Sequence, residues 1–188
     1  MRKLAPIIVI SVFIIALNAC RTDKGNIDPS KIASVEEDII IQKDWKTFDK
    51  TEYSIQYPEN WNLDSSGIGG SMFTISSALN SNDVITENVN MQIENLSDDI
   101  GLDEFAKDAI TKIASVFTIL TKERIKSDKD DYYRLVFSGE KNGVGVKVEQ
   151  RYRVKNKKAY VIGFMSSKSD FEKDKVIGEK IVNSFKLK

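Results

Sequence analysis

The segment Tyr53-Ser-Ile-Gln-Tyr-Pro-Glu-Asn-Trp-Asn-Leu63 decides how the folded part of this chain begins. Its large apolar residues alternate with serine and glutamine as far as Pro58, and this period of two is typical of a strand with one buried face. Proline has no amide hydrogen to donate to a neighbouring strand, so the strand is predicted to end there. Apolar residues resume at Trp61, which predicts a second strand after a proline corner.

Before this segment, the chain begins with a basic tripeptide and an almost unbroken apolar run from Leu4 to Leu17. The run is shorter than the ~20 residues that span a bilayer comfortably. It ends at the small residue Ala19, and the chain becomes polar directly after Cys20. This order is typical of a secretory signal peptide, which we place at residues 1–19. The chain has only 1 cysteine, so no internal disulfide can form.

The boundary Leu17-Asn-Ala-Cys20 resembles a bacterial lipobox. The resemblance implies that Cys20 is diacylated, with palmitate or similar chains, and becomes the mature N-terminus. Each buried methylene contributes roughly 0.8 kcal/mol, and two chains hold a protein stably on a membrane where one does not. The alternative is an uncleaved N-terminal anchor with a chance cysteine. We therefore expect lipid attachment at Cys20 and a place in the bacterial cell envelope, on the periplasmic side or at the cell surface.

The stretch after Cys20 is polar and contains few large apolar residues, so it cannot bury enough surface to order itself. We predict a flexible tether over residues 20–40 that holds the remainder off the membrane. Trp45 and Phe48 are expected to lie at the start of a single folded domain, residues 41–188.

Composition excludes several classes of function. The 28 basic and 28 acidic residues balance, whereas a nucleic-acid-binding protein needs a concentrated positive surface. The chain has 0 histidines, which removes the usual general base and the commonest metal ligand. No Gly-x-Ser-x-Gly segment occurs to support a serine nucleophile. We therefore expect no catalytic, metal or cofactor site, no enzymatic activity and no nucleic-acid partner.

The glycine-rich segment Asp64–Gly70 is the one stretch that invites a phosphate-binding interpretation. A phosphate loop needs a helix N-terminus to supply its amides. The residues after this segment, Ser71–Ser76, have the pattern of a strand instead. A flexible turn is the better prediction.

Two helices are predicted. The first spans Leu102–Phe117, where apolar residues recur at steps of three and four, and Gly101 or Asp99 is its expected N-cap. The second follows Ser169-Asp-Phe-Glu172, which has the form of a capping box. Gly178 in its middle costs about 1 kcal/mol relative to alanine, which suggests a close approach to the sheet.

Strands are predicted on both sides of the first helix. One lies around Val89–Glu94, and antiparallel strands follow the helix, with tight turns at Asn142-Gly143 and Asn156-Lys157. In the segment Val144–Lys155, valines point one way and Lys147, Glu149, Arg151, Arg153 and Lys155 point the other. The charged side is either a basic docking patch for an acidic partner or lipid headgroups, or the solvated face of an antiparallel sheet, which we favour.

Three of these segments together resemble the PsbP-like superfamily. Tyr53–Trp61 is similar to its opening F-S-I-x-Y-P-x-x-W motif, and Leu102–Phe117 to the helix after its central strands. The end, Phe171 through Ile181-Val-Asn-Ser-Phe185, is similar to its closing I-x-x-S-F helix. The resemblance extends from Trp45 to Lys188. It implies an α+β fold in which an antiparallel β-sheet is flanked by helices as an α/β/α sandwich.

The superfamily includes a photosystem II extrinsic subunit, a Ran-binding nuclear transport factor and many bacterial lipoproteins. The resemblance implies a non-enzymatic protein-binding or accessory role, with an envelope protein as partner, at a membrane reached through Cys20. Fold alone does not fix function. The alternative hypothesis is a carrier of a small hydrophobic ligand or lipid, bound between the sheet and the helices.

Overall fold

The computed structural model describes residues 44–78, 85–97, 100–126 and 131–188. The leader, Cys20, the whole of the predicted tether and the N-cap candidate Asp99 lie outside the described residues. The strands are β1 (Trp45–Asp49), β2 (Tyr53–Pro58), β3 (Asn62–Asp64), β4 (Phe73–Ser76), β5 (Asn88–Asn95), β6 (Thr118–Lys126), β7 (Asp131–Lys141), β8 (Val144–Lys155), β9 (Lys158–Ser167) and β10 (Lys186–Leu187). The helices are α2 (Leu102–Ala114) and α3 (Phe171–Asn183), with a short 3-10 turn, η1 (Ile68–Gly70).

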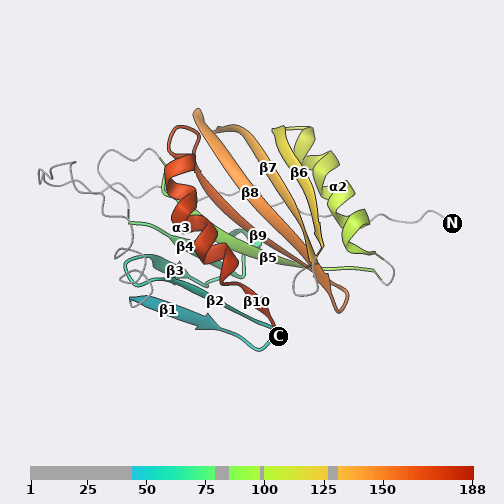
Figure 1. Ribbon diagram of the computed structural model, residues 1–188, viewed down its shortest axis with the longest axis horizontal. Coiled ribbons are helices and arrows are strands. Elements are labelled where there is room, and N and C mark those ends of the chain that lie inside the picture. The colour runs from blue at the N-terminus through green and yellow to red at the C-terminus, as the bar shows by residue number, and fades with distance from the viewer. Residues whose placement is uncertain (1–43, 79–84, 98–99, 127–130) are drawn as a thin grey trace, which may run out of the picture.

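A seven-stranded antiparallel sheet forms the centre of the domain, in the order β3-β4-β5-β9-β8-β7-β6. Beside it lies a three-stranded antiparallel sheet, β1-β2-β10. Helix α3 packs on one face of the large sheet and α2 on the other, each over its own cluster of buried apolar residues (Figure 1). The predicted α+β class and the sandwich of helices around an antiparallel sheet are confirmed.

The long strands are joined by the two predicted turns. Asn142 and Gly143 have φ of 52° and 78°, and Asn156 and Lys157 have φ of 51° and 59°. Positive φ at both central positions gives the turn whose twist matches the flanking strands. These turns fix the register in which β8 pairs with β7 on one side and with β9 on the other.

The opening and closing motifs meet in space. In β2, Tyr53, Ile55 and Tyr57 are buried, as their alternation predicts. The side chain of Gln56 lies on the opposite, exposed face of β2. Its backbone amide donates a hydrogen bond of 2.8 Å to Oγ of Ser184, which follows α3. One hydroxyl therefore connects the first part of the domain with its last helix.

Two details of the helices differ from the prediction. Helix α2 begins after Gly101 but ends at Ala114, so Val116 lies beyond it and is 72% exposed. Helix α3 has Asp170 as its N-cap, one residue later than the capping box requires, and no side-chain cap bond forms. Glu172 pairs instead with Lys147 at 2.6 Å, so the predicted capping box is wrong.

The charged side of β8 was predicted to face solvent, and the structure shows that its central residues do not. Glu149, Arg151 and Arg153 are buried. Arg151 donates hydrogen bonds to Glu149 at 3.1 Å and to Asn183 of α3 at 2.6 Å. Because α3 and neighbouring aromatic side chains cover this part of the sheet, the three residues form neither a wet face nor an open basic patch.

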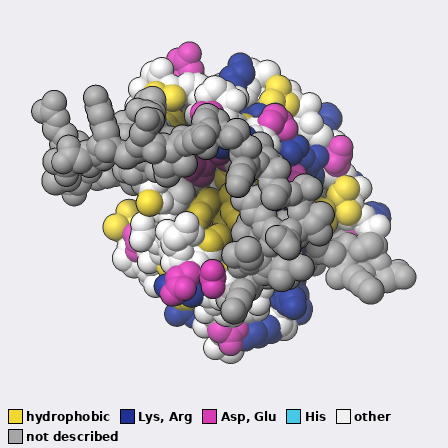
Figure 2. All heavy atoms as spheres, turned by 60° about the vertical axis from the view of Figure 1, so that its left-hand side comes forward, with side chains coloured by type: hydrophobic (Ala, Val, Ile, Leu, Met, Phe, Trp, Pro, Cys, Tyr) yellow, Lys and Arg dark blue, Asp and Glu magenta, His cyan; other side chains and the backbone are white. Residues whose placement is uncertain are grey.

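The surface of the domain is mixed in character. Figure 2 turns the left-hand side of Figure 1 forward and shows hydrophobic side chains reaching the surface among acidic and basic ones. Among the described residues, no helix is long and apolar enough to cross a membrane.

Candidate functional site

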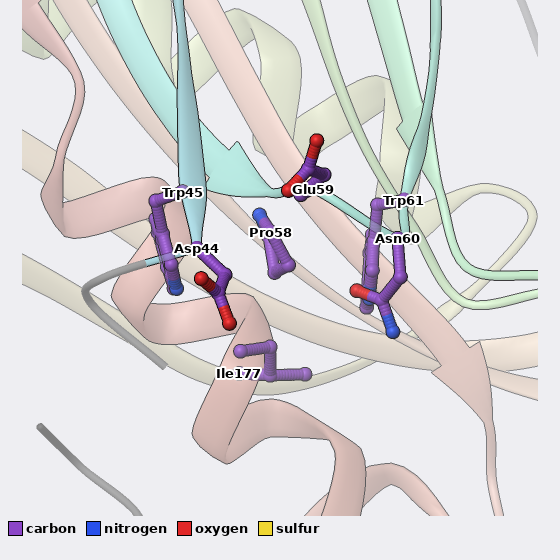
Figure 3. Close-up of a pocket in the computed structure, with 7 residues that line it drawn as sticks. All are labelled: Asp44, Trp45, Pro58, Glu59, Asn60, Trp61 and Ile177. Carbon is purple, nitrogen blue, oxygen red and sulfur yellow. The ribbon is translucent and has the colours of Figure 1, made fainter. Parts of the chain in front are cut away.

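A hollow of the described surface lies at the proline corner and has a volume of about 550 Å³. Trp45 and Trp61 stand on opposite sides of it, with Pro58 between them and Ile177 of α3 below in the view of Figure 3. We call it the double-tryptophan pocket. The remaining residues of its lining are Asp44, Glu59 and Asn60.

The strand pairing explains why the two indoles face the same hollow. Trp45 of β1 lies opposite Pro58 of β2 in the antiparallel register. The amide of Glu59 donates to the carbonyl of Asp44 at 2.7 Å, and the amide of Trp61 donates to the carbonyl of Pro58 at 3.0 Å. The second bond closes a tight turn, which brings Trp61 back beside the end of β2 within three residues.

Helix α3 supplies the base of the pocket. Its buried face packs on the sheet through Phe171, Ile181 and Val182, and Ile177 is only partly buried at the edge of the same cluster. Both indoles also contact that cluster while remaining partly exposed. The walls are therefore fixed by the core and still reach the surface, which is the usual construction of a site with a preformed apolar lining.

Two acidic residues line the pocket, and the carboxylate of Glu59 points away from the hollow (Figure 3). Asp44 and Glu59 are the charged residues among its described lining. Lys46 lies nearby, and its Nζ is 3.5 Å from a carboxylate oxygen of Glu59. The side chains of this pair are 50% and 64% exposed, so water screens the interaction and it contributes at most about 1 kcal/mol.

One polar atom of the pocket residues has no partner. Nε1 of Trp45 is buried and makes no hydrogen bond among the described residues. An unsatisfied buried donor costs about 1–3 kcal/mol. Less than 1 Å² of this atom is accessible, so a ligand in the hollow would reach it only if the indole moved.

The sequence alone did not identify this pocket. Cys20, the one predicted site residue, lies outside the described residues. The glycine-rich segment forms the η1 turn and leads into strand β4, as predicted, so no helix N-terminus follows it. Within the described ranges, no group of acidic residues is arranged to hold a metal ion. The available signal was that the chain has only 2 tryptophans and both flank the Tyr-Pro corner.

Known structures share the fold at low sequence identity. The cyanobacterial PsbP of Synechocystis sp. PCC 6803 superposes with a TM-score of 0.57 at 15% identity, covering 87% of this chain and 98% of that one. LpqN, described as involved in cell envelope biogenesis of Mycobacterium tuberculosis, superposes with a TM-score of 0.56 at 13% identity, covering 82% of this chain and 97% of that one. The Ran-binding protein Mog1p of Saccharomyces cerevisiae gives 0.51 at 9% identity and coverages of 76% and 95%.

Comparison with proteins of curated function finds no match. The family model described as PsbP-like protein matches residues 3–187, nearly the whole chain. This match agrees with the resemblance in the opening, helical and closing motifs and with the observed sandwich. The chain belongs to the PsbP-like family.

Proposed function

We propose that this protein is a lipid-anchored accessory module of the bacterial cell envelope, which binds another envelope protein and catalyses no reaction. The double-tryptophan pocket carries the proposal, because tryptophan is enriched at the centres of protein–protein interfaces. Its walls are held by the core, so binding there costs little ordering of side chains.

The position of the pocket agrees with this role. Asp44 lies on the rim, directly after the segment that would connect the domain to Cys20. A structural neighbour gives further support, since LpqN has the same fold and is described as involved in cell envelope biogenesis. A tethered domain with its binding pocket near the tether would keep a partner close to the membrane.

Photo-crosslinking in intact cells tests the partner. A photoreactive residue in place of Asn60, which is exposed and lines the pocket, is expected to trap one envelope protein in stoichiometric yield. The same residue in place of Val116, which is exposed beyond α2, is the control and should trap none of it. Equal capture from both positions, or from neither, would count against a pocket-mediated partner.

Anchoring gives a second prediction. Cys20→Ser is expected to abolish incorporation of a labelled fatty acid and to move the protein from the membrane fraction to the soluble fraction, because the acyl chains supply the membrane affinity. Metabolic labelling and fractionation of cells measure both effects. If the native protein incorporates no labelled fatty acid and stays in the membrane, the uncleaved leader is the anchor and lipid attachment is not needed.

A carrier of lipid or of a small hydrophobic ligand is the second candidate. Large aromatic residues fill the space between the sheet and the helices. Under α3, the ring centroids of Phe164 and Phe171 are 5.5 Å apart, and under α2 those of Phe105 and Tyr152 are 5.8 Å apart. The double-tryptophan pocket lies at the surface rather than in this interior. Bound lipid extracted from the purified protein would support the carrier function.

A further inference from the structure

We propose that a cluster of lysines at one end of the small sheet binds anionic phospholipid headgroups of the membrane that holds the protein. The proposal rests on the proposed function for the membrane anchor, and its other grounds lie in the described residues. The cluster comes from three parts of the chain, the β1–β2 turn, the β8–β9 hairpin and β10, which end close together in Figure 1. Its members, which we call the lysine cluster, are Lys50, Lys155, Lys157, Lys158, Lys186 and Lys188.

Hydrogen bonds show that the three parts of the cluster are adjacent. Nζ of Lys155 donates to the carbonyl of Lys188 at 2.7 Å, and Nζ of Lys188 donates to the carbonyl of Lys50 at 2.8 Å. Lys155 lies opposite Lys158 in the β8–β9 register, and Lys157 lies in the turn that joins them. The lysines therefore form one continuous surface, although they are far apart in sequence.

The lysine cluster keeps an excess of positive charge. Lys188 pairs with Asp49 at 2.6 Å, and Lys158 pairs with Glu52. The six lysines outnumber these two carboxylates together with the chain-terminal one. All the lysines are exposed except Lys158, which is partly buried. Most of this charge is therefore within reach of an anionic surface.

The β8–β9 turn carries a lysine at a position where glycine would be unstrained. Lys157 has a φ of 59°, in the left-handed region that is unfavourable for a residue with a Cβ atom. The equivalent position of the β7–β8 turn is Gly143, with a φ of 78°. Strain of this kind is concentrated at functional positions. At the outermost point of the hairpin, a charged side chain is placed to meet a charged surface.

The composition of the cluster favours a lipid surface over an acidic protein. Protein–protein interfaces are depleted in lysine and enriched in arginine and aromatic residues. The cluster consists of lysine alone, whose flexible ammonium groups suit a fluid surface with no fixed arrangement of charges. Clusters of about four to eight basic residues are typical of sites that bind anionic lipids, and each lysine strengthens such binding roughly fivefold.

Binding through the lysine cluster would also orient the domain. Strand β1 runs from Trp45 at the pocket to Asp49 beside the cluster, so the two sites lie at opposite ends of a strand about 16 Å long. A membrane at the cluster leaves the double-tryptophan pocket directed away from the bilayer, where another envelope protein can reach it. Residues 20–43 can span up to about 80 Å when extended, which is enough to connect Asp44 with the membrane in this orientation.

Lysine labelling in vesicles tests the contact. The full-length acylated protein is reconstituted into vesicles of phosphatidylcholine, alone or mixed with phosphatidylglycerol. An N-hydroxysuccinimide ester acylates accessible lysines, and mass spectrometry gives the rate for each one. Phosphatidylglycerol should slow labelling of the cluster at least about fivefold, and high salt should restore the rate. Lys122 on β6 and Lys173 on α3 are exposed internal controls whose rates should not change.

A pair of matched variants tests whether the charges act together. One variant replaces three lysines of the cluster: Lys155→Gln, Lys157→Gln and Lys186→Gln. The control removes the same charge from exposed positions elsewhere: Lys107→Gln, Lys122→Gln and Lys173→Gln. Lys50 remains in both variants as the reporter, and its protection by phosphatidylglycerol should be lost in the first and unchanged in the second. All six substitutions are at exposed positions, so the fold is retained.

The anchor and the lysine cluster can fail separately. Equal labelling rates in both kinds of vesicle, with the protein still bound to them, would overturn the headgroup contact and leave the anchor intact. Protection of the cluster in intact cells but not in phosphatidylglycerol vesicles would identify an acidic protein as its partner and overturn the proposal. If the native protein carries no acyl chain and phosphatidylglycerol still slows labelling, the lysine cluster is supported and the lipid anchor is wrong.

Discussion

Glu149→Gln is expected to lower the free energy of unfolding by about 3 kcal/mol, because it leaves buried arginine charge without its partner. Glu149 is 4% exposed and lies in the middle of β8. Its two carboxylate oxygens accept from Arg134 at 2.7 Å and from Arg151 at 3.1 Å. Arg151 is itself buried, so its charge has no water to replace the lost carboxylate.

Unfolding in urea measures the effect as a shift in midpoint at unchanged slope. Glu123→Gln is the matched control, since Glu123 also pairs with Arg134, at 3.2 Å, but its side chain is 48% exposed. The control should cost less than about 1 kcal/mol. If the two variants are equally stable, the buried ion pairs contribute no more than surface ones.

A double variant distinguishes the electrostatic contribution of the Glu149–Arg151 pair from the contribution of the volume that the two side chains fill. Glu149→Leu with Arg151→Met replaces the charges by apolar side chains of similar size, and such replacements are often neutral or stabilising. We expect the double variant to be more stable than Glu149→Gln. A double variant less stable than the single one would show that other contacts of Arg151, such as its bond to Asn183, dominate.

The same carboxylate predicts a pH dependence. Burial raises the pKa of Glu149, but the hydrogen bond from Arg134 and the charges of Arg151 and Arg134 outweigh it, so the pKa lies below its usual value. A carboxyl whose pKa is lower in the folded state adds stability that is present above its unfolded pKa and is lost as the pH falls through the folded pKa. Stability should therefore fall on the acid side of the ordinary glutamate pKa, and Glu149→Gln should remove part of this fall.

Local patterns predicted most of the sheet correctly. The alternation in β2 placed Tyr53 and Ile55 in the core, and the asparagine–glycine pair marked the turn between β7 and β8. Both features depend on residues close in sequence, where one face of a strand or the φ of one turn decides the outcome. The closing motif was likewise sufficient to locate α3.

Features that depend on distant contacts were not predictable in the same way. The alternating charges of β8 have the pattern of a solvated strand, and only the packing of α3 shows that Glu149 and Arg151 are buried. Strand β10 has only two residues, too few for a pattern, and exists because Ser54 and Tyr53 of β2 are placed beside it. The pocket requires Trp45 of β1, Trp61 of the turn after β2 and Ile177 of α3, which are distant in sequence or in different elements.

Gly178→Ala is expected to lower the free energy of unfolding by about 2 kcal/mol, although alanine is the better helix former by about 1 kcal/mol. Gly178 lies in the middle of α3, where the helix crosses β9. A Cβ atom at this position would lie 2.4 Å from Cδ2 of Phe164. The ring cannot move aside freely, because Phe164 is 2% exposed and packs against Phe171.

The sign of the change in the free energy of unfolding shows whether packing or helix propensity dominates at position 178. Val176→Ala, two residues earlier on the same helix at a position 59% exposed, is the control and should be neutral or slightly stabilising. In a Phe164→Leu background the ring is absent, so the added methyl group of Gly178→Ala should cost far less, and the resulting double-mutant cycle measures the clash directly. If Gly178→Ala raised the free energy of unfolding in the native background, α3 would have to lie farther from β9 than the position of Phe164 beneath Gly178 indicates. The predicted loss instead follows from a helix held against the sheet closely enough that only glycine fits.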